Sequence, residues 1–374
     1  MTETELAAES GAKTGVGTKA AGARAPVRTG KQDTTNALHL AASWYIALPS
    51  ADLRSGPKRV ELFGRTLVAW RDQRGKPVLA PQACPHMGAS LADGRVVDGC
   101  LRCPFHHWRF DGTGACVEIP DSERIPSAAL LRTYPVAEQH GYIWAWYGSA
   151  QPMFDLPVMP ALDPGRSGRR RFRQFRLADM TGATVRRILE NTYDPDHLVA
   201  LHGLRVAGPT GLRMLDGPQD TADHGPAIPA EAWLGAELTW PNYVGTLGTV
   251  TKLLGTNADH FVLRVDGWPS GQRITYFADG VPQYRLLLAT TPIAPNRTVQ
   301  HITVAVEAEG RPFRDLRRYL ANRLEVTFAS NQDLPIFNTI EPGDRHGIYL
   351  ESDRGVLRFR KYYESWVDRV SADA

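Results

Sequence analysis

Four side chains that commonly bind metals occur in two short segments, and each segment supplies one cysteine and one histidine. Cys84 and His86 form the pattern C-x-H, and Cys103 and His106 form the pattern C-x-x-H. When two thiolates hold one iron of a [2Fe–2S] cluster and two neutral imidazoles hold the other, the reduction potential lies well above that of an all-cysteine cluster. The pattern therefore predicts a Rieske-type cluster, which stores and passes one electron.

A structural zinc site with two cysteines and two histidines is the competing interpretation. Zinc modules favour C-x₂₋₄-C and H-x₃₋₅-H pairs, whereas each segment here pairs one cysteine with one histidine. Pro85 and Pro104, which directly follow the two cysteines, are expected to hold the two loops open. We therefore favour the cluster. Cys100 and Cys116 lie outside the pattern and are expected to be small buried hydrophobic residues.

A second group of metal-binding residues lies further along the chain. His197 and His202 are five residues apart, and Asn191 and Asp194 precede them. Two histidines and one carboxylate hold the non-haem Fe(II) that activates O₂, leaving positions open for oxygen and substrate. Asp333 is the best candidate for the carboxylate, because we expect it at the end of a helix that faces the cavity of a sheet. A pair of histidines at this spacing, taken alone, more often consists of ordinary core and surface residues. Beside a [2Fe–2S] domain, the interpretation as an iron site is favoured.

The elements around the first site have a β pattern. Short apolar runs separated by turn residues such as Gly64 and Gly141 predict a small all-β domain. The runs cover residues 44–48, 60–63, 66–70 and 142–147. The proline-rich stretch 151–164 can be neither a long helix nor a central strand, and it is expected to be a linker.

The second half of the chain predicts an α+β domain, an antiparallel sheet with a long C-terminal helix. We expect a short helix over 184–191, a long loop over 204–229 and then several strands, at 236–240, 261–265, 273–277, 284–290 and 301–307. Apolar residues then recur at spacings of three and four, which predicts an amphipathic helix that buries one face. They are Phe313, Leu316, Leu320, Leu324 and Phe328.

Composition excludes several classes of protein. The net charge is only +3, from 43 basic and 40 acidic residues, which excludes a general nucleic-acid binder. No apolar run is long enough for a membrane span or a secretory signal, so we expect a cytoplasmic protein. Residues 1–35 hold almost no large apolar side chain and are expected to be a disordered tail. The formal fingerprint Gly15-Val16-Gly17-Thr18-Lys19-Ala20 in that tail follows no strand, so we discard it as a nucleotide site.

Taken together, the two motifs resemble the catalytic subunit of the Rieske non-haem iron oxygenases over roughly residues 38–370. The resemblance implies a Rieske domain over residues 36–150 and, over 151–374, a helix-grip catalytic domain with O₂-activating iron in its cavity. It also implies a homotrimer in which the cluster of one subunit feeds the iron of its neighbour. Residue by residue it implies Cys84, His86, Cys103 and His106 as cluster ligands, His197, His202 and Asp333 as iron ligands, and Asp194 as a bridge between a cluster histidine and an iron histidine.

Within that family the chain resembles members that oxidise an arylamine to a nitroarene. The stretches that carry this likeness are 40–45, 62–65, 91–95, 103–108 and 363–370. We therefore expect O₂-dependent monooxygenation of an aromatic or heteroaromatic specialised metabolite, at an amine nitrogen. Hydroxylation, demethylation or oxidative cyclisation of a steroid-like or prodiginine-like compound is the alternative. The remote alternative is a protein that catalyses no reaction, either a Rieske electron carrier or a metal-stabilised binding module.

An apolar, aromatic cavity would suit such a substrate. Its candidate residues are Trp233, Trp240, Tyr243, Leu253, Leu254, Phe261 and Trp268. Because no plausible flavin or nicotinamide motif is found, electrons are expected from a separate ferredoxin or reductase. A basic run interleaved with phenylalanines is interpreted first as a solvated or interface-lining strand, then as a dock for an acidic ferredoxin, and last as a nucleic-acid site. It contains Arg166, Arg169, Arg170, Arg171, Arg173 and Arg176.

Overall fold

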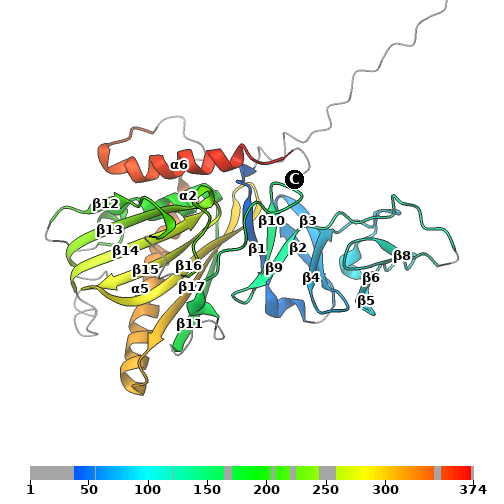
Figure 1. The fold of residues 1–374 in the computed structure, drawn as a ribbon, viewed down its shortest axis with the longest axis horizontal. Coiled ribbons are helices and arrows are strands. Elements are labelled where there is room, and N and C mark those ends of the chain that lie inside the picture. The colour runs from blue at the N-terminus through cyan, green and yellow to red at the C-terminus, as the bar shows by residue number, and fades with distance from the viewer. Residues whose placement is uncertain are drawn as a thin grey trace, which may run out of the picture.

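The computed structural model describes residues 38–54, 56–120, 122–163, 171–203, 206, 208–219, 225–243, 258–340 and 347–371. The tail expected over residues 1–35, and Arg166, Arg169 and Arg170, lie outside these ranges. In Figure 1 the N-terminal strands lie on one side of the molecule and a large sheet with two long helices on the other. The expected fold class, an all-β part followed by an α+β part, is therefore confirmed.

The described part of the N-terminal half forms three small antiparallel sheets. The first contains β1 (Ser43–Pro49), β10 (Tyr142–Tyr147) and β9 (Val136–Gln139). The second contains β2 (Lys58–Leu62), β3 (Arg65–Arg71) and β4 (Pro77–Pro81). The third contains β5 (Arg95–Val97), β6 (Cys100–Arg102), β7 (Arg109–Phe110) and β8 (Cys116–Glu118). All four apolar runs expected here form strands.

The second sheet separates two hydrophobic cores because side chains on a strand alternate between faces. On one face, Leu67, Ala69 and Leu79 join the large core that continues into the C-terminal half. On the other face, Val68 and Trp70 join a smaller core that also contains Cys84 and Cys103. The predicted cluster loops therefore have a core of their own. Cys116 is buried as expected, but Cys100 is only half-buried, so the expectation of a buried side chain is wrong there.

The C-terminal half is built on a seven-stranded antiparallel sheet in the order β11-β17-β16-β15-β14-β13-β12. Its strands are β11 (Arg171–Thr181), β12 (Gly211–Met214), β13 (Leu234–Tyr243), β14 (Ala258–Trp268), β15 (Gly271–Ala278), β16 (Val281–Ala294) and β17 (Arg297–Ala308). Every expected strand is present and longer than expected. Residues 204–229 were expected to form only a loop, but the short edge strand β12 pairs there with β13.

Four α-helices are described in this half, and two of them are long. They are α2 (Val185–Glu190), α3 (Pro195–Ala200), α5 (Pro312–Thr339) and α6 (Arg354–Val367). Among the described residues of both halves, the 3₁₀ turns are η1 (Ser50–Leu53), η2 (Leu91–Asp93), η3 (Pro160–Leu162), η4 (Asn191–Tyr193), η6 (Ala230–Ala232) and η7 (Glu351–Asp353). α5 packs on β11 and β17, and α6 packs on α2 and β13. In Figure 1, α6 lies along the top of the view and α5 projects below the sheet.

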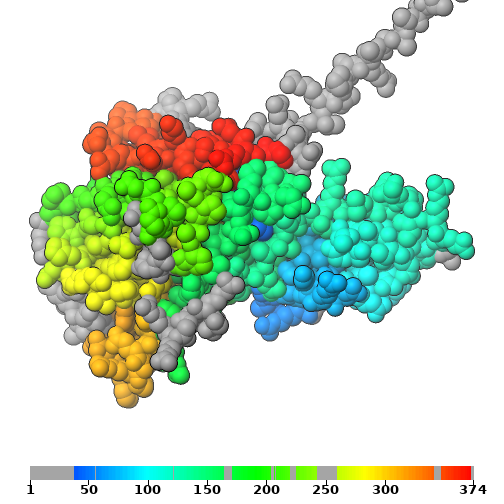
Figure 2. All heavy atoms as spheres, in the orientation of Figure 1, coloured from blue at the N-terminus to red at the C-terminus, as the bar shows by residue number. Residues whose placement is uncertain are grey.

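The orientation of α5 differs from the prediction. Its apolar stripe was expected to be buried, yet Phe313 is 91% exposed and Leu316, Leu320, Leu324 and Phe328 are 39–53% exposed. The buried positions are instead Asp315, Ala321, Asn322, Val326, Ser330 and Phe337. The spacing predicts that one face is apolar but not which face meets the sheet. Here Asp315 binds the backbone N–H groups of residues 309–311, which anchors the start of the helix with the stripe outward. The orange N-terminal end of α5 stands out from the surface in Figure 2.

The two halves share one continuous core and backbone hydrogen bonds. The large core contains buried residues of β1 and β10 together with β14 to β17. At the turn between β2 and β3, the N–H groups of Phe63 and Gly64 donate to the carbonyl groups of Pro292 and Ile293 on β16. The two halves are therefore fixed against each other, and the domain boundary near residue 150 stays a prediction. No helix among the described residues is long and apolar enough to cross a bilayer.

Candidate functional site

The two loops expected to hold a [2Fe–2S] cluster lie next to each other at the smaller core. Cys84 follows β4 and Cys103 follows β6, and both thiols are buried in mutual hydrogen-bonding contact. Burial raises the pKa of the Cys84 thiol above its ordinary value, although the N–H of His86 opposes the shift by donating to the sulfur. Each loop turns back on itself, because the N–H of Cys84 donates to Ala89 and that of Cys103 to Trp108.

The two histidines of these loops point the other way, toward the surface. The rings of His86 and His106 are exposed, and their centroids are 4.6 Å apart. Trp108 stacks on His86 with the ring planes 7° apart. The four predicted ligands are thus brought together with two sulfurs inward and two imidazoles outward. This donor set fits a [2Fe–2S] cluster whose histidine-ligated iron faces solvent.

The second candidate site is positioned by two short helices joined by a turn. Thr184 caps α2, since its hydroxyl accepts a hydrogen bond from the N–H of Arg187. Asp194 caps α3 by accepting from the N–H groups of Asp196 and His197, and an N-terminal carboxylate of this kind stabilises a helix start. The cap places His197 in the first turn of α3, and His202 follows just after the helix ends.

His197, His202 and Asp333 form a compact group. Their ligand atoms all lie within 4.8 Å of one another, and the Nε2 atom of His202 is 3.4 Å from Oδ1 of Asp333. Asp333 lies in the last two turns of α5, and the helix continues past Pro335 to Thr339. The expectation that Asp333 ends the helix is therefore wrong, because a proline removes one hydrogen bond without ending this helix.

Hydrogen bonds fix which nitrogen of each ring faces the group. The Nδ1–H of His202 donates to Oε1 of Gln332 at 3.0 Å, and the Nδ1–H of His197 donates to the carbonyl oxygen of Asp194 at 2.5 Å. With Nδ1 protonated, the neutral ring has its lone pair on Nε2. The Nδ2 atom of Asn191 lies 3.3 Å from Nε2 of His197, where its N–H can donate to that lone pair while no metal is bound. Both Nε2 atoms are thus prepared to bind a metal.

Electrostatics favour the same conclusion. Burial and the neighbouring His202 lower the pKa of His197 to about 4, so the ring is neutral at pH 7. Burial raises the pKa of Asp333 above its ordinary value, although His202 and a hydrogen bond from Asn191 oppose the shift. The Oδ1 atom of Asp333 is buried without a hydrogen-bond partner. A cation between the three side chains would supply that partner, and two neutral imidazoles with one carboxylate suit Fe(II).

Asp194 contacts His197, the predicted iron ligand that was expected to be its partner. Besides capping α3, it has its Oδ2 atom 4.0 Å from Nδ1 of His197. Burial raises the pKa of this carboxyl group, which its bonds to the backbone N–H groups of α3 oppose. The further contact to a cluster histidine of another subunit stays a prediction.

The three side chains open into a cavity of about 120 Å³ between α5 and the sheet. Its walls are mainly aliphatic and aromatic, with residues from α2, α3, α5 and four strands. Among the described residues the aliphatic part of the wall includes Ile188, Leu198, Leu263, Ile274, Leu286, Leu288 and Ile302. These were not predicted individually, although their alternation along β14 to β17 marks one face of the sheet.

Of the aromatic residues expected in this wall, Phe261 lines the cavity. Trp233, Trp240 and Trp268 do not line it, because their rings are buried in the core. The side chain of Tyr243, and Leu253 and Leu254, lie outside the described residues. Bulk alone therefore does not separate a cavity wall from a core.

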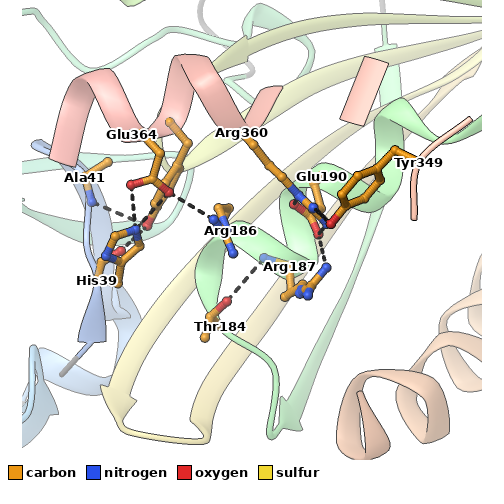
Figure 3. A network of polar contacts seen from close by, with 10 residues as sticks. His39, Ala41, Thr184, Arg186, Arg187, Glu190, Tyr349, Arg360 and Glu364 are labelled. Carbon is orange, nitrogen blue, oxygen red and sulfur yellow. Dashed lines mark hydrogen bonds and ion pairs between the residues drawn. The ribbon is translucent and has the colours of Figure 1, made fainter. Parts of the chain in front are cut away.

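A charged network attaches this site to the rest of the molecule (Figure 3). Buried Glu190, at the end of α2, accepts hydrogen bonds from Arg187 and from both Nε and Nη2 of Arg360 on α6. One turn further along α6, Glu364 binds His39 and Arg186. Because Glu190 directly precedes Asn191, the network holds the first residue of the predicted iron motif in place.

The basic run is partly structural. Arg171, Arg173 and Arg176 are exposed on the edge strand β11. Arg176 donates to the carbonyl oxygen of His140 at 2.8 Å and lies over the ring of Tyr142, so it joins the two halves. This contact agrees with an interface-lining strand.

Comparisons with known proteins find similarity along most of the chain. Residues 43–135 match the family model of the Rieske [2Fe-2S] domain. The chain is 37% identical over 354 residues to aminopyrrolnitrin oxygenase PrnD of Pseudomonas fluorescens, covering 92% of this chain and 96% of that protein. It is 35% identical over 336 residues to a probable 3-ketosteroid-9-alpha-monooxygenase, oxygenase component, of Rhodococcus rhodochrous, covering 87% and 79%.

Solved structures show a similar fold. The structure of Pseudomonas putida CBB5 NdmA with caffeine has a TM-score of 0.68 at 18% identity, covering 90% of this chain and 93% of that chain. Dicamba monooxygenase bound to dicamba has a TM-score of 0.62 at 19% identity, covering 88% and 97%. The whole described architecture, and not only the N-terminal half, is therefore shared with these structures.

Proposed function

Because the chain belongs to the Rieske non-haem iron oxygenases, we propose that it monooxygenates an arylamine at nitrogen in the cavity beside His197, His202 and Asp333. The observation that carries the proposal is the unpartnered Oδ1 atom of Asp333, which faces two oriented Nε2 atoms at the wall of an apolar cavity. Members of this family are oxidoreductases that use a [2Fe–2S] cluster, mononuclear iron and O₂.

The predicted site residues would have separate roles. His197, His202 and Asp333 would hold the iron, and Cys84, His86, Cys103 and His106 the cluster. When bound, the cluster delivers single electrons and the iron provides open positions for O₂. Gln332 and Asp194 orient the imidazoles, and the apolar wall excludes water and holds a flat ring by contact.

The reaction balances as a monooxygenation. One oxygen atom of O₂ enters the substrate and the other leaves as water, with two electrons from the donor and two protons. Repeated rounds carry an arylamine through the hydroxylamine and nitroso levels to the nitroarene, with water leaving at the nitroso stage. An arylamine is supported by the 37% identity to a protein named as an aminopyrrolnitrin oxygenase. Oxidation of a C–H bond is the second candidate, supported by the 35% identity to a protein named as a ketosteroid monooxygenase.

Electrons would come from a separate ferredoxin or reductase, as homologues of this family need electron-transfer partners. The exposed rings of His86 and His106 offer the donor an accessible edge of the cluster. A homotrimer, in which Asp194 links the two sites across an interface, is part of the same proposal.

The test is His197→Ala with His260→Ala as the control, since His260 is an exposed histidine on β14 away from the site. The purified wild type should contain about three irons and two sulfides per chain. The His197→Ala variant should lose one iron and all oxygenation of an arylamine panel while keeping the signal of the reduced cluster. Turnover that survives this substitution would sink the proposal.

A further inference from the structure

One polar side chain in the cavity has no partner and is not explained by the iron. Among the described residues that line the cavity, two have a buried oxygen atom without a hydrogen-bond partner, Asp333 and Gln300. The iron accounts for Oδ1 of Asp333. Nothing in the site described above accounts for Oε1 of Gln300, although the side chain is 95% buried, with a relative exposure of 5%.

The sheet fixes the direction of this side chain. Gln300 lies two residues before Ile302 on β17, so both side chains point into the cavity from the same face. Its neighbours in register are Asp179 on β11 and Thr290 on β16. Asp179 is already engaged, since it accepts a hydrogen bond from Ser330 on α5 at 3.1 Å. The hydroxyl of Thr290 is likewise buried without a partner.

The position lies close to the predicted iron. Ser330 precedes Asp333 by three residues, a rise of about 4.5 Å along the helix, and it contacts Asp179, the strand neighbour of Gln300. A ligand between α5 and the sheet can therefore reach the iron ligands and Gln300 at once. Leaving an amide oxygen unpaired in an apolar cavity is unfavourable, and native proteins rarely do so.

We propose that Gln300 determines substrate specificity: its carboxamide oxygen accepts a hydrogen bond from an uncharged N–H or O–H group of the substrate. The substrate class is then a planar aromatic amine with a second, neutral donor group away from the nitrogen that reacts. The donor is neutral because a carboxamide carries no charge to attract a cation. This inference rests on the proposed function and narrows its substrate.

The experiment uses two probes that differ in one donor, 5-aminoindole and 1-methyl-5-aminoindole. Binding to the iron-loaded protein is measured by calorimetry without O₂, and oxygenation is measured separately. The wild type should bind 5-aminoindole at least about tenfold more tightly, the effect of one lost hydrogen bond that leaves a buried acceptor unpaired. In Gln300→Met, which keeps the length of the side chain without the amide, the ratio should fall to about one.

Val299→Thr is the matched control, because Val299 is the neighbour of Gln300 on β17 but lies half-buried on the other face of the sheet, outside the cavity lining, and this variant should keep the wild-type ratio. Gln300→Leu repeats the test if the Met variant folds poorly. Neither substitution should lower the Tm, since no hydrogen bond of the free protein is lost. A wild-type ratio near one, an unchanged ratio in both Gln300 variants, or no binding of either probe would overturn the inference.

Binding and oxygenation test the role of Gln300 and the proposed nitrogen oxygenation independently of each other. If the probes bind with the expected ratio but neither is oxygenated, the role of Gln300 stands and nitrogen oxygenation fails. If both probes are oxygenated and bind equally, the proposed function stands and Gln300 does not select the donor. In that case an ordered water is the partner of Oε1.

Discussion

Gln332 hydrogen-bonds the imidazole of His202 from the position directly before Asp333, so one turn of α5 supplies both a predicted iron ligand and the group that orients another. A shift of α5 would therefore move both together. The same relationship makes the contribution of Gln332 measurable, because it touches the ring of His202 without being a ligand itself.

Gln332→Leu should weaken Fe(II) binding roughly tenfold to a hundredfold, the usual cost of losing a group that orients a metal-bound histidine. Without the acceptor, the proton of the imidazole is free to occupy Nε2, where it blocks the metal. Fe(II) titration of metal-depleted protein measures the effect. The control is Asn331→Leu at the neighbouring exposed position. Equal affinities in wild type and Gln332→Leu would contradict the orienting role.

Glu190→Gln should destabilise the protein by about 3 kcal/mol, because it leaves the largely enclosed guanidinium of Arg360, whose side chain is 11% exposed, with an uncompensated charge. Since Glu190 precedes Asn191, mononuclear iron occupancy should fall as well, while the cluster content stays constant. Urea unfolding and iron analysis check the two effects. The control is Glu351→Gln, at an exposed position of η7 where little change is expected. A loss of cluster instead of mononuclear iron would show that the network supports the other half.

His301 makes stability depend on pH. Burial and nearby Arg176 lower its pKa to about 4 in the folded protein, from an ordinary value of about 6.5. The unfolded chain therefore binds the proton more readily, and stability from this residue is fully present above pH 6.5 and is lost as pH falls toward 4. At about pH 4 and below the full loss is about 3 kcal/mol, since each pH unit between the two pKa values contributes about 1.4 kcal/mol.

His301→Phe should remove this slope, so that the wild type loses more stability than the variant between pH 7 and pH 4.5 in urea unfolding. His260→Phe, at an exposed position, should follow the wild type. Parallel curves for wild type and His301→Phe would show that other groups cause any acid sensitivity.

Because the apolar stripe of α5 faces outward, polar substitutions in it should have little effect on stability. Leu320→Glu should change the stability by less than about 0.5 kcal/mol, because the side chain is 53% exposed. Val326→Ala, at a buried position of the same helix, should cost about 1–2 kcal/mol because it leaves a small void there. Thermal unfolding at several protein concentrations compares them. A loss for Leu320→Glu as large as that for Val326→Ala would mean that another surface covers the stripe in solution.

Local chemistry was the part of the site that the sequence could predict. Cys84 with His86, and His197 with His202, are each close in sequence, so a single loop or helix brings each pair together. Asp333 comes from more than a hundred residues away, and only the requirement for a carboxylate on a rigid element selected it. The structure places it within reach of both histidines.

The errors have a common physical cause. Periodicity identified α5 but not its buried face, because the face is chosen by contacts such as that between Ser330 and Asp179. Aromatic content suggested Trp240 and Trp268 as cavity wall, but whether a large ring lines a space or fills it depends on the register of strands that are distant in sequence. Gln300 and Gln332 gave no signal, since a glutamine becomes informative only when its neighbours are known.

The sheet of β2, β3 and β4 also marks where the molecule is modular. Its two faces pack against different hydrophobic cores. One core is shared by both halves, and the other contains the cysteines of the predicted cluster loops. A chimaera joined in the proline-rich stretch after residue 150 would therefore cut through a continuous interior and mismatch two apolar surfaces. One that exchanges the segment carrying β5 to β8 with its two loops would cross only the small core. Exchanging this segment between relatives should transfer the reduction potential of the cluster. The substrate preference should remain that of the protein that receives the segment.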